Sequence, residues 1–306
     1  MKTTSLKSHS SNPTEGASFL QTISRTPPLN SLLEAISSYR VLVVGDGIVD
    51  EYCYVKPLGK SPKENIITAR ITGKESFAGG AWAAGRHVKG FCAKVDIATA
   101  PGFVVKRRFV EEAHVRKMFE VHEERRVDTE LDEPIYENYD LVIVADFGHG
   151  FITTQMIEAL TRRAKFLAVN AQTNSANHGF NLITKYPRAD FVVLDELEAR
   201  LAAHDRDSPI ENVIERLGFH KIIVTLGQSG CIGYDGAFCT DTAGVNRVVD
   251  TMGAGDAFFC VTAPFAAAGA DMATLCRIGN AAGAIKCGVV GHRKSVTKEA
   301  LMGELA

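Results

Sequence analysis

The sequence of 306 residues has no apolar run long enough to cross a membrane, no excess of one charge and no paired cysteine motif. Its longest apolar stretch, residues 257–270, contains Pro264 and is shorter than the roughly 20 residues that a transmembrane helix needs. The formal net charge of −2 provides no field that would attract nucleic acid or an acidic membrane surface. These absences predict a protein whose partners are small molecules, with no nucleic acid or membrane among them.

The 7 cysteines are scattered without any Cys-x-x-Cys spacing, and several lie in apolar runs, as buried free thiols do. The N-terminus lacks the apolar segment of a signal peptide. Both features predict a reducing, cytoplasmic environment. With 45% hydrophobic residues, the chain can bury one large core.

Residues 1–28 are rich in Ser and Thr and contain three prolines, so they predict a flexible tail before one domain at residues 29–306. In that domain, helical patterns alternate with short apolar runs that are typical of strands in a parallel sheet. The helical patterns include residues 29–39, 153–164 and 196–203, and the strand patterns cover residues 40–45, 95–98, 141–145, 166–169, 191–194 and 222–225. This alternation predicts an α/β fold with a doubly wound, mostly parallel sheet, and ligands beyond the carboxyl ends of its strands.

The most specific motif is Asp-Thr-Met-Gly-Ala-Gly-Asp-Ala-Phe-Phe at residues 250–259. Two glycines, an acid and an apolar run predict a tight turn that opens a buried helix, whose first amides lack intrahelical partners and can bind a phosphate. The residues that would supply these groups are Gly253, Ala254, Gly255 and Asp256. Asp256 would orient an attacking hydroxyl and accept its proton, and the helix terminus predicts a lowered pKa for its carboxyl. The simpler interpretation is a glycine turn with an Asp in the first helical turn.

The ten-residue motif resembles the C-terminal signature of the ribokinase-like (phosphofructokinase-B type) carbohydrate kinases, in which the Asp of Gly-Ala-Gly-Asp is the catalytic base. The resemblance covers about residues 38–302. It implies a ribokinase-like three-layer α/β/α fold with a small β lid, formed by residues 52–72 together with 104–121 as a further candidate. It also implies an ATP-dependent carbohydrate kinase that uses ATP and Mg²⁺, and it leaves a homodimer as an open question.

The N-terminal region is similar to the heptose-phosphate kinases, the branch that includes the kinase domain of ADP-heptose synthases. The similarity rests on residues 45–52, Ser61-Pro62 and the Gly79-Gly80-Ala81 turn. It implies that Asp46 or Asp50 and the glycines Gly79 and Gly80 contact the sugar, whose hydroxyls donate well to carboxylates. A turn Asp beside a solvated Asp is the alternative. The acceptor would be a sugar or a sugar phosphate, with a heptose phosphate as one candidate.

The resemblance also places the nucleotide. The loop after the strand at residues 222–225 would lie under ATP through Thr225, Gly227 and Gly230, and Ala282 and Gly283 would pack beside the adenine. Small residues at the last two positions are equally good core packing.

Asp195 and Glu198 occupy the position where the family usually has Asn-x-x-Glu, and the Glu would organise Mg²⁺ and phosphate. Magnesium keeps most of its waters, so one protein carboxylate is enough. The alternative is a capping box, in which an Asp N-cap and a Glu at the third helical position satisfy backbone amides.

Several positions depart from the heptose kinases. Their Asp-Pro-Lys is replaced by Asn170-Ala171-Gln172 ahead of further asparagines, whose amides would suit sugar hydroxyls, and a loop Lys is replaced by His149. The pairs around Arg107 and Arg116 could hold the phosphate of a phosphosugar, or simply belong to a solvated hairpin. The departures motivate a second hypothesis, a kinase-like module that binds sugar or nucleotide without turnover within a larger assembly.

Overall fold

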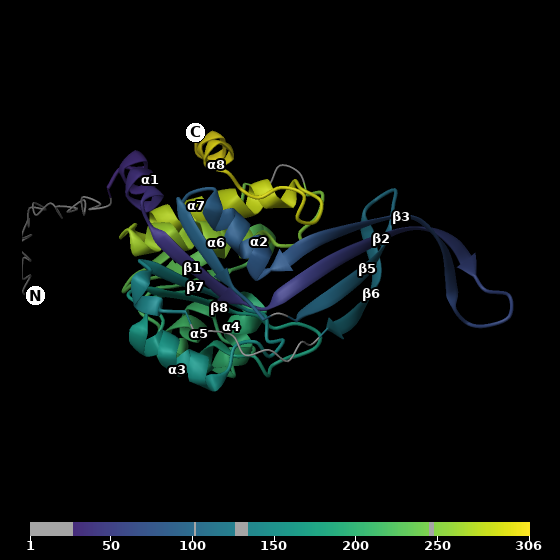
Figure 1. Cartoon of the computed structure of the whole chain (residues 1–306), viewed down its shortest axis with the longest axis horizontal. Coiled ribbons are helices and arrows are strands. Elements are labelled where there is room, and N and C mark those ends of the chain that lie inside the picture. Colours follow the sequence, from purple (N-terminus) through teal and green to yellow (C-terminus); the bar gives the residue numbers. More distant parts are fainter. Residues whose placement is uncertain (1–26, 101, 126–133, 245–247) are drawn as a thin grey trace, which may run out of the picture.

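The computed structural model describes residues 27–100, 102–125, 134–244 and 248–306. Most of the predicted tail, residues 1–26, therefore lies outside the described residues. The described chain forms a three-layer core with a smaller sheet that extends from one end of it (Figure 1).

The central sheet has eight strands in the order β12-β11-β10-β9-β8-β7-β1-β4. The strands from β10 to β4 pair in parallel, and β11 and β12 are antiparallel. This arrangement confirms the predicted α/β fold with a mostly parallel sheet. The strands are β1 (Arg40–Gly45), β4 (Lys94–Ala98), β7 (Leu141–Asp146), β8 (Leu167–Ala171), β9 (Phe191–Asp195), β10 (Ile222–Thr225), β11 (Cys231–Tyr234) and β12 (Phe238–Asp241).

Helices cover both faces of this sheet (Figure 1). Strand β1 shows the cause, because Val41 and Val43 point into one apolar cluster while Leu42 and Val44 point into the other. The first cluster is closed by α1 (Leu29–Ser37), α2 (Ala81–Lys89), α6 (Ala254–Ala267), α7 (Met272–Cys287) and α8 (Lys298–Leu305), and the second by α3 (Thr154–Arg163), α4 (Glu196–Ala203) and α5 (Ile210–Leu217). Short 3₁₀ turns occur at Tyr136–Asn138, Ile183–Lys185 and Gly227–Ser229.

The second sheet, which we call the lid, has four strands in the order β3-β2-β5-β6. It is built from the hairpin β2 (Gly47–Lys60) and β3 (Ile67–Gly80) and from the hairpin β5 (Phe103–Glu111) and β6 (Arg116–Arg125). The first hairpin contains the predicted residues 52–72 and is longer, and residues 104–121 belong to the same sheet. Strand β4 lies at the edge of the central sheet, so the chain passes from that edge directly into the lid.

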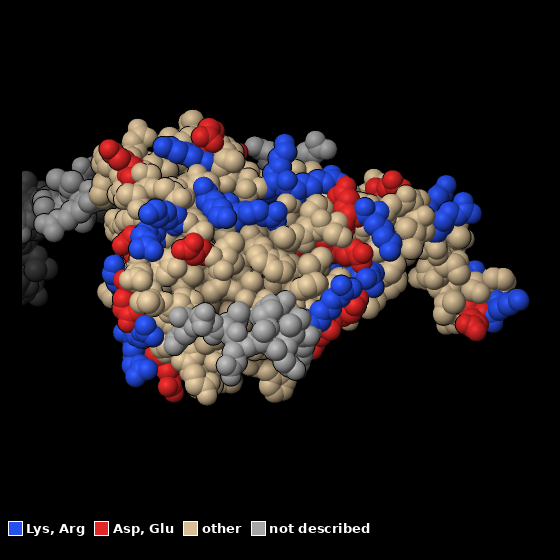
Figure 2. Space-filling view, viewed as in Figure 1, with Lys and Arg blue, Asp and Glu red and all other residues tan. Residues whose placement is uncertain are grey.

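Lysines, arginines and acids are interspersed on the face shown in Figure 2, which agrees with a chain that has no large field of one sign. Among the described residues, no helix is both long enough and apolar enough to cross a membrane.

Candidate active site

The turn at residues 250–253 leads into α6 as the sequence predicts. Gly253 is the N-cap residue and has φ of 73°, a left-handed backbone conformation that residues other than glycine rarely adopt. The Ala254 N–H donates to the Thr251 carbonyl at 3.2 Å. Within the part of the chain that the structure describes, no partner is found for the N–H groups of Gly253, Gly255 and Asp256. Three amides therefore remain available to an anion at this helix terminus.

Asp256 lies in the first turn of α6, where its Oδ1 accepts a hydrogen bond from Gln172 Nε2 at 2.6 Å. Burial raises the pKa of the Asp256 carboxyl, although the electrostatic interaction with His292 and the Gln172 hydrogen bond oppose this. The expectation of a lowered pKa was wrong, because desolvation outweighs the effect of the helix terminus. A raised pKa makes the carboxylate a better proton acceptor.

A cavity of about 270 Å³ lies beside the turn and is a candidate nucleotide site. Thr225, Gly227 and Gly230 form part of its wall, as the resemblance implies. The predicted residue Ala282 does not, because it is fully buried in the apolar core. The face of helix α7 that lines the cavity instead has the spacing i, i+3, i+4, i+7, and its residues are Asn280, Gly283, Ala284 and Cys287.

Asp195, Glu198 and Asp256 line a second, smaller cavity of about 200 Å³ that includes Gly253 and Gly255. Asp195 and Glu198 do form a capping box: the Glu198 N–H donates to Asp195 Oδ1 at 2.7 Å, and the Asp195 N–H donates to Glu198 Oε2 at 2.8 Å. Glu198 Oε1 also accepts the Thr173 N–H at 3.0 Å. The capping role that the sequence left open is therefore present.

Burial and the nearby Asp195 and Asp256 carboxylates raise the pKa of Glu198 to about 8. No cluster of three or more potential metal ligands is found among the described residues. Asp195, Glu198 and Asp256 nevertheless fit Mg²⁺, because their carboxylates repel one another and a bound cation would relieve that repulsion. A hydrated Mg²⁺ does not need three direct protein ligands.

The predicted sugar-binding Asp46 holds backbone instead of projecting freely. Its Oδ2 accepts the N–H of Phe147 at 3.1 Å and its Oδ1 accepts that of Phe151 at 3.1 Å, which fixes the loop after β7. Burial raises the pKa of the Asp46 carboxyl. The same carboxylate lines a cavity of about 230 Å³ together with Arg125 and His149, which is a candidate acceptor site.

The amides after β8 also hold backbone. Asn170 Nδ2 donates to the Val193 carbonyl at 2.8 Å, and its Oδ1 accepts from Gln172 Nε2 at 2.8 Å. Asn177 and Asn181 donate to the carbonyls of residues 147 and 146. The later asparagines are therefore occupied by backbone contacts and are not free to bind sugar hydroxyls, whereas Asn170 and Gln172 line a cavity with Asp256.

The Gly79-Gly80 turn has a packing reason. A Cβ at Gly79 would overlap the Asp50 carboxylate, and one at Gly80 would overlap the Asp46 carbonyl. Gly80 also has φ 54° and ψ −135°, which only glycine adopts without strain. The two glycines thus allow the lid to join the core closely beside the predicted sugar site.

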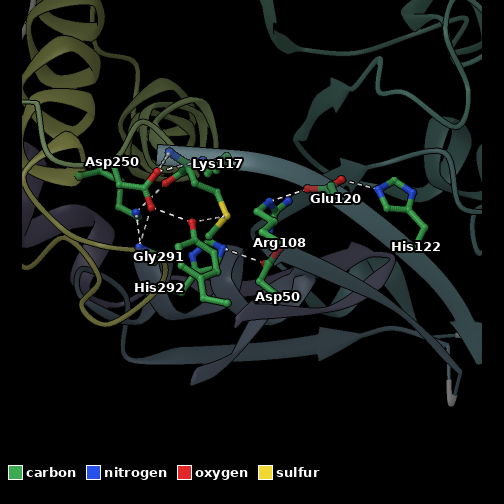
Figure 3. A network of polar contacts seen from close by, with 11 residues as sticks. Asp50, Arg108, Lys117, Glu120, His122, Asp250, Gly291 and His292 are labelled. Atoms are coloured by element: carbon green, nitrogen blue, oxygen red, sulfur yellow. Dashed lines mark hydrogen bonds and ion pairs between the residues drawn. The ribbon is translucent and has the colours of Figure 1, made fainter. Parts of the chain in front are cut away.

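Asp50 belongs to a chain of ion pairs that runs across the inner face of the lid (Figure 3). Arg108 pairs with Asp50 and, through Nε, with Glu120 at 2.6 Å. His292 Nε2 lies 3.3 Å from Asp50 Oδ2, so the carboxylate already has two side-chain partners from different parts of the chain. These partners lower the pKa of Asp50 despite its burial.

Arg107 faces the opposite side of β5, where it pairs with Glu51 and Glu123. The prediction that Arg107 binds substrate is therefore revised, since alternate residues of a strand point to opposite faces. Its neighbour Lys106 faces the inner side, is 7% exposed and interacts electrostatically with Asp50 and Asp256. Strand alternation next to Arg107 was the signal that could have identified it.

His149 lies near Lys106, and burial together with that charge lowers the pKa of its imidazole to about 4. Its Nε2 is buried without a hydrogen-bond partner among the described residues. A neutral imidazole with an unused nitrogen at the acceptor cavity can hydrogen-bond a sugar hydroxyl. The sequence alone gave this residue no clear role.

Comparison with known proteins decides the family. Residues 114–299 match the model described as pfkB family carbohydrate kinase. The chain belongs to this family. Membership confirms the predicted enzyme class, a phosphotransferase with an alcohol group of a carbohydrate as acceptor. Asp256 and the turn before it, which a binding module without turnover would not need, are both in place.

Among curated relatives, this pfkB-family chain is 23% identical over 297 residues to "Bifunctional protein HldE" of Campylobacter jejuni subsp. doylei, with 85% of this chain and 64% of the relative covered. It is 27% identical over 301 residues to the protein of the same name from Desulfatibacillum aliphaticivorans, with 83% and 61% covered. The chain spans less than two thirds of the length of these relatives.

Solved structures with the same fold include the ribokinase of Thermotoga maritima, with a TM-score of 0.69, 16% identity and coverage of 87% of this chain and 99% of that one. The ribokinase of Arabidopsis thaliana complexed with ribose and ATP gives a TM-score of 0.66, 16% identity and coverage of 88% and 99%. These likenesses confirm the ribokinase-like fold of the pfkB-family chain.

Proposed function

We propose that this chain transfers the γ-phosphoryl group of ATP to a hydroxyl of a sugar phosphate, with a heptose phosphate as the leading candidate. The observation that carries the proposal is the position of Asp256. Its carboxylate adjoins the three amides for which the described residues offer no partner, beside the candidate nucleotide cavity and close to the inner face of the lid.

In the proposed reaction, Asp256 orients the acceptor hydroxyl and takes its proton as the phosphoryl group moves to the oxygen. The amides of Gly253 and Gly255 stabilise negative charge that develops on the transferred group. Gln172 holds Asp256 in place through the 2.6 Å hydrogen bond. Asp195 and Glu198 would hold the waters of Mg²⁺, which neutralises phosphate charge when it is bound.

The charge of Lys106 supports an acceptor that carries a phosphate. Lys106 is a buried cation whose ammonium interacts electrostatically with Asp256 and also influences His149, which lines the acceptor cavity. A largely desolvated cation beside a polar cavity favours an anionic group. The similarity of residues 45–52 and 79–81 to heptose-phosphate kinases supports a heptose as the sugar.

A screen of ATP consumption against heptose phosphates, hexose phosphates and free sugars tests the proposal. We expect a phosphorylated sugar to give the highest kcat/KM. If an unphosphorylated sugar is the better substrate, the phosphosugar assignment fails while the kinase assignment stands. If no acceptor stimulates ATP consumption although ATP binds, the kinase assignment fails for this chain.

A matched pair of variants tests the role of Lys106. Lys106→Met should raise the KM of the phosphorylated acceptor about tenfold or more, because a desolvated charge-assisted contact contributes roughly 1.5–3 kcal/mol. Arg107→Met removes the neighbouring charge from the opposite face of β5 and should leave that KM nearly unchanged. A fall in kcat without a change in KM would instead assign Lys106 to the transferred phosphoryl group.

We also propose that two copies of this chain form a dimer through the outer faces of their lids. Phe119 and Val121 are exposed there, and Phe119 stacks on Phe109 with ring centroids 4.4 Å apart. Exposed apolar side chains grouped on one sheet face are typical of an interface. Sedimentation of the wild type and of Phe119→Asp should show a dimer that the substitution weakens, and a monomeric wild type would refute the assignment.

A further inference from the structure

Lys286 is a buried cation that the proposed reaction leaves without a role. It lies in the last turn of α7, is 1% exposed, and donates from Nζ to the Met252 carbonyl at 2.6 Å and to the Gly291 carbonyl at 2.7 Å. Burial lowers the pKa of the Lys286 ammonium, and the nearby carboxylates of Asp250 and Asp256 oppose that effect. One of the two carbonyls that hold this ammonium, that of Met252, belongs to the phosphate-binding turn itself.

Asp250 makes the complementary contacts to the same two residues. It accepts the Met252 N–H at 3.1 Å and the Gly291 N–H at 2.9 Å, the second of which is drawn in Figure 3. Met252 and Gly291 are therefore each held at the N–H by a carboxylate and at the carbonyl by an ammonium. Two segments that are far apart in the sequence are thus fixed by the same two side chains, Asp250 and Lys286, while Asp250 itself is paired with Lys117 at 3.0 Å.

The contact at Met252 bears directly on the turn. The Met252 carbonyl and the Gly253 N–H belong to the same trans peptide group, so they point in opposite directions. When Lys286 draws the carbonyl toward itself, it turns the Gly253 N–H the other way. Gly253 lines the small cavity with Asp256, and its N–H is one of the amides without a partner among the described residues.

The end of α7 holds the turn in a second way. The Cys287 carbonyl accepts the N–H of Val249 at 2.8 Å and that of Asp250 at 3.1 Å. Cys287 also forms part of the wall of the candidate nucleotide cavity. One helix end thus connects that cavity to the turn that precedes the proposed base.

We propose that the ammonium of Lys286 acts as a built-in monovalent cation that orients the phosphate-binding turn, so that the enzyme needs no K⁺ or NH₄⁺ for activity. The inference rests on the proposed phosphoryl transfer and assigns Lys286 as a positioning residue. Removing its side chain in Lys286→Ala would leave a space bounded by two carbonyl oxygens and close to two carboxylates. Carbonyl oxygens are the ligands that replace the hydration shell of K⁺ in proteins, so the variant should bind such a cation in place of the ammonium.

The experiment compares the wild type, Lys286→Ala and Lys286→Met in chloride salts of tetramethylammonium, potassium and ammonium at constant ionic strength. In tetramethylammonium, which is too large for the space, Lys286→Ala should lose about tenfold or more in kcat, because small misplacements of positioning groups cost up to ~100-fold. Potassium or ammonium should restore most of that loss. The wild type should have the same kcat in all three salts, and Lys286→Met should stay low in all three because its side chain fills the space.

Melting temperature gives a readout that needs no turnover. A cation that binds the folded variant raises its melting temperature by mass action. Potassium or ammonium should therefore stabilise Lys286→Ala relative to tetramethylammonium and leave the wild type unchanged. Lys221→Ala is the matched control, since Lys221 Nζ also donates to a backbone carbonyl, that of Ala270 at 3.2 Å, but on a surface away from the turn. That variant should show no dependence on the salt.

The possible results distinguish a failure of the inference about Lys286 from a failure of the proposed function. A wild type that loses activity in tetramethylammonium overturns the inference, and so does a folded Lys286→Ala whose kcat and melting temperature ignore the cation. A wild type that turns over no acceptor in any salt overturns the proposed function, while the melting curves still decide the role of Lys286. If Lys286→Ala does not fold in any salt, including potassium and ammonium, the space does not accept a cation and the inference fails.

Discussion

Asp256→Asn tests the assignment of the proton acceptor most directly. The substitution keeps the size of the side chain, and the amide oxygen can still accept the hydrogen bond that Gln172 Nε2 makes at 2.6 Å. The backbone amides of the turn are unchanged, so the groups that hold phosphate remain. The change therefore removes the charge and basicity of one side chain and little else.

The expected loss can be worked out from the role of a general base. Positioned acid–base groups contribute typically 10²–10⁴-fold in rate, which corresponds to about 3–5 kcal/mol at 1.36 kcal/mol per factor of ten. We expect kcat to fall within this range while the affinity for ATP stays within a few-fold. Because burial raises the pKa of Asp256, the acid limb of the wild-type kcat/KM profile should lie above the ordinary range of an aspartate.

Stability separates a catalytic from a structural role. A carboxyl with a raised pKa in the folded state favours folding at low pH, and that contribution is lost as the pH rises from the unfolded value through the folded one. At neutral pH the charge of Asp256 therefore costs stability, and Asp256→Asn should melt at the same temperature as the wild type or higher.

Turnover assays, calorimetry with ATP and melting curves measure these quantities. Asp271→Asn is the matched control, because Asp271 also occupies a helix N-terminus, where it caps α7 by accepting the Thr274 N–H at 2.8 Å. Asparagine caps helices well, so that variant should be active and stable. If Asp256→Asn keeps more than about a tenth of the wild-type kcat, or if ATP affinity falls as much as kcat does, the assignment is refuted.

Three further predictions follow from the other parts of the site. Glu198→Gln should raise the Mg²⁺ concentration needed for half-maximal rate more than it lowers stability. The loss of one cap contact costs about 0.5–2 kcal/mol, but the neutral amide needs no proton uptake on folding, whereas Glu198 does because its pKa is raised to about 8. The reverse result in a magnesium titration with melting curves would leave only the capping role. Without Mg²⁺, the wild-type melting temperature should fall between about pH 5 and pH 8 as Glu198 ionises, and Glu198→Gln should flatten this dependence, since the pKa is raised from the usual range to about 8. Ala284→Leu should fill the candidate nucleotide cavity and raise the KM of ATP about tenfold or more with little effect on the acceptor, and a normal KM would exclude that cavity as the nucleotide site.

The layered fold and the phosphate turn could be predicted from the sequence because both depend on local patterns. Apolar runs such as residues 40–45 and 141–145 fit strands that are covered on both faces, and in the observed sheet they form the neighbouring interior strands β1 and β7. Glycine at 253 and an apolar run after Asp256 specify a turn and a buried helix within a few residues.

The motifs in the sequence did not decide which side each residue of a helix or strand faces. Ala282 and Gly283 are adjacent, yet α7 buries the first in the core and turns the second to the cavity. Arg107 and Lys106 are adjacent on β5, and the pleat sends them to opposite faces. A resemblance between motifs identifies such segments without deciding the phase of each helix or strand.

The pKa of a side chain was the property that the sequence predicted least well, because it depends on all the groups that surround the side chain in the folded protein. The helix terminus alone predicts a lowered pKa for Asp256, and the burial that raises it is created by the packed site. The sequence by itself determined the alternation of helices with strands of a parallel sheet, the phosphate turn and the resemblance to the family. Only the tertiary structure decided that Asp46 holds a loop, that Lys106 faces the site and that Lys286 lies beneath the turn, because each of these contacts joins residues that are distant along the chain.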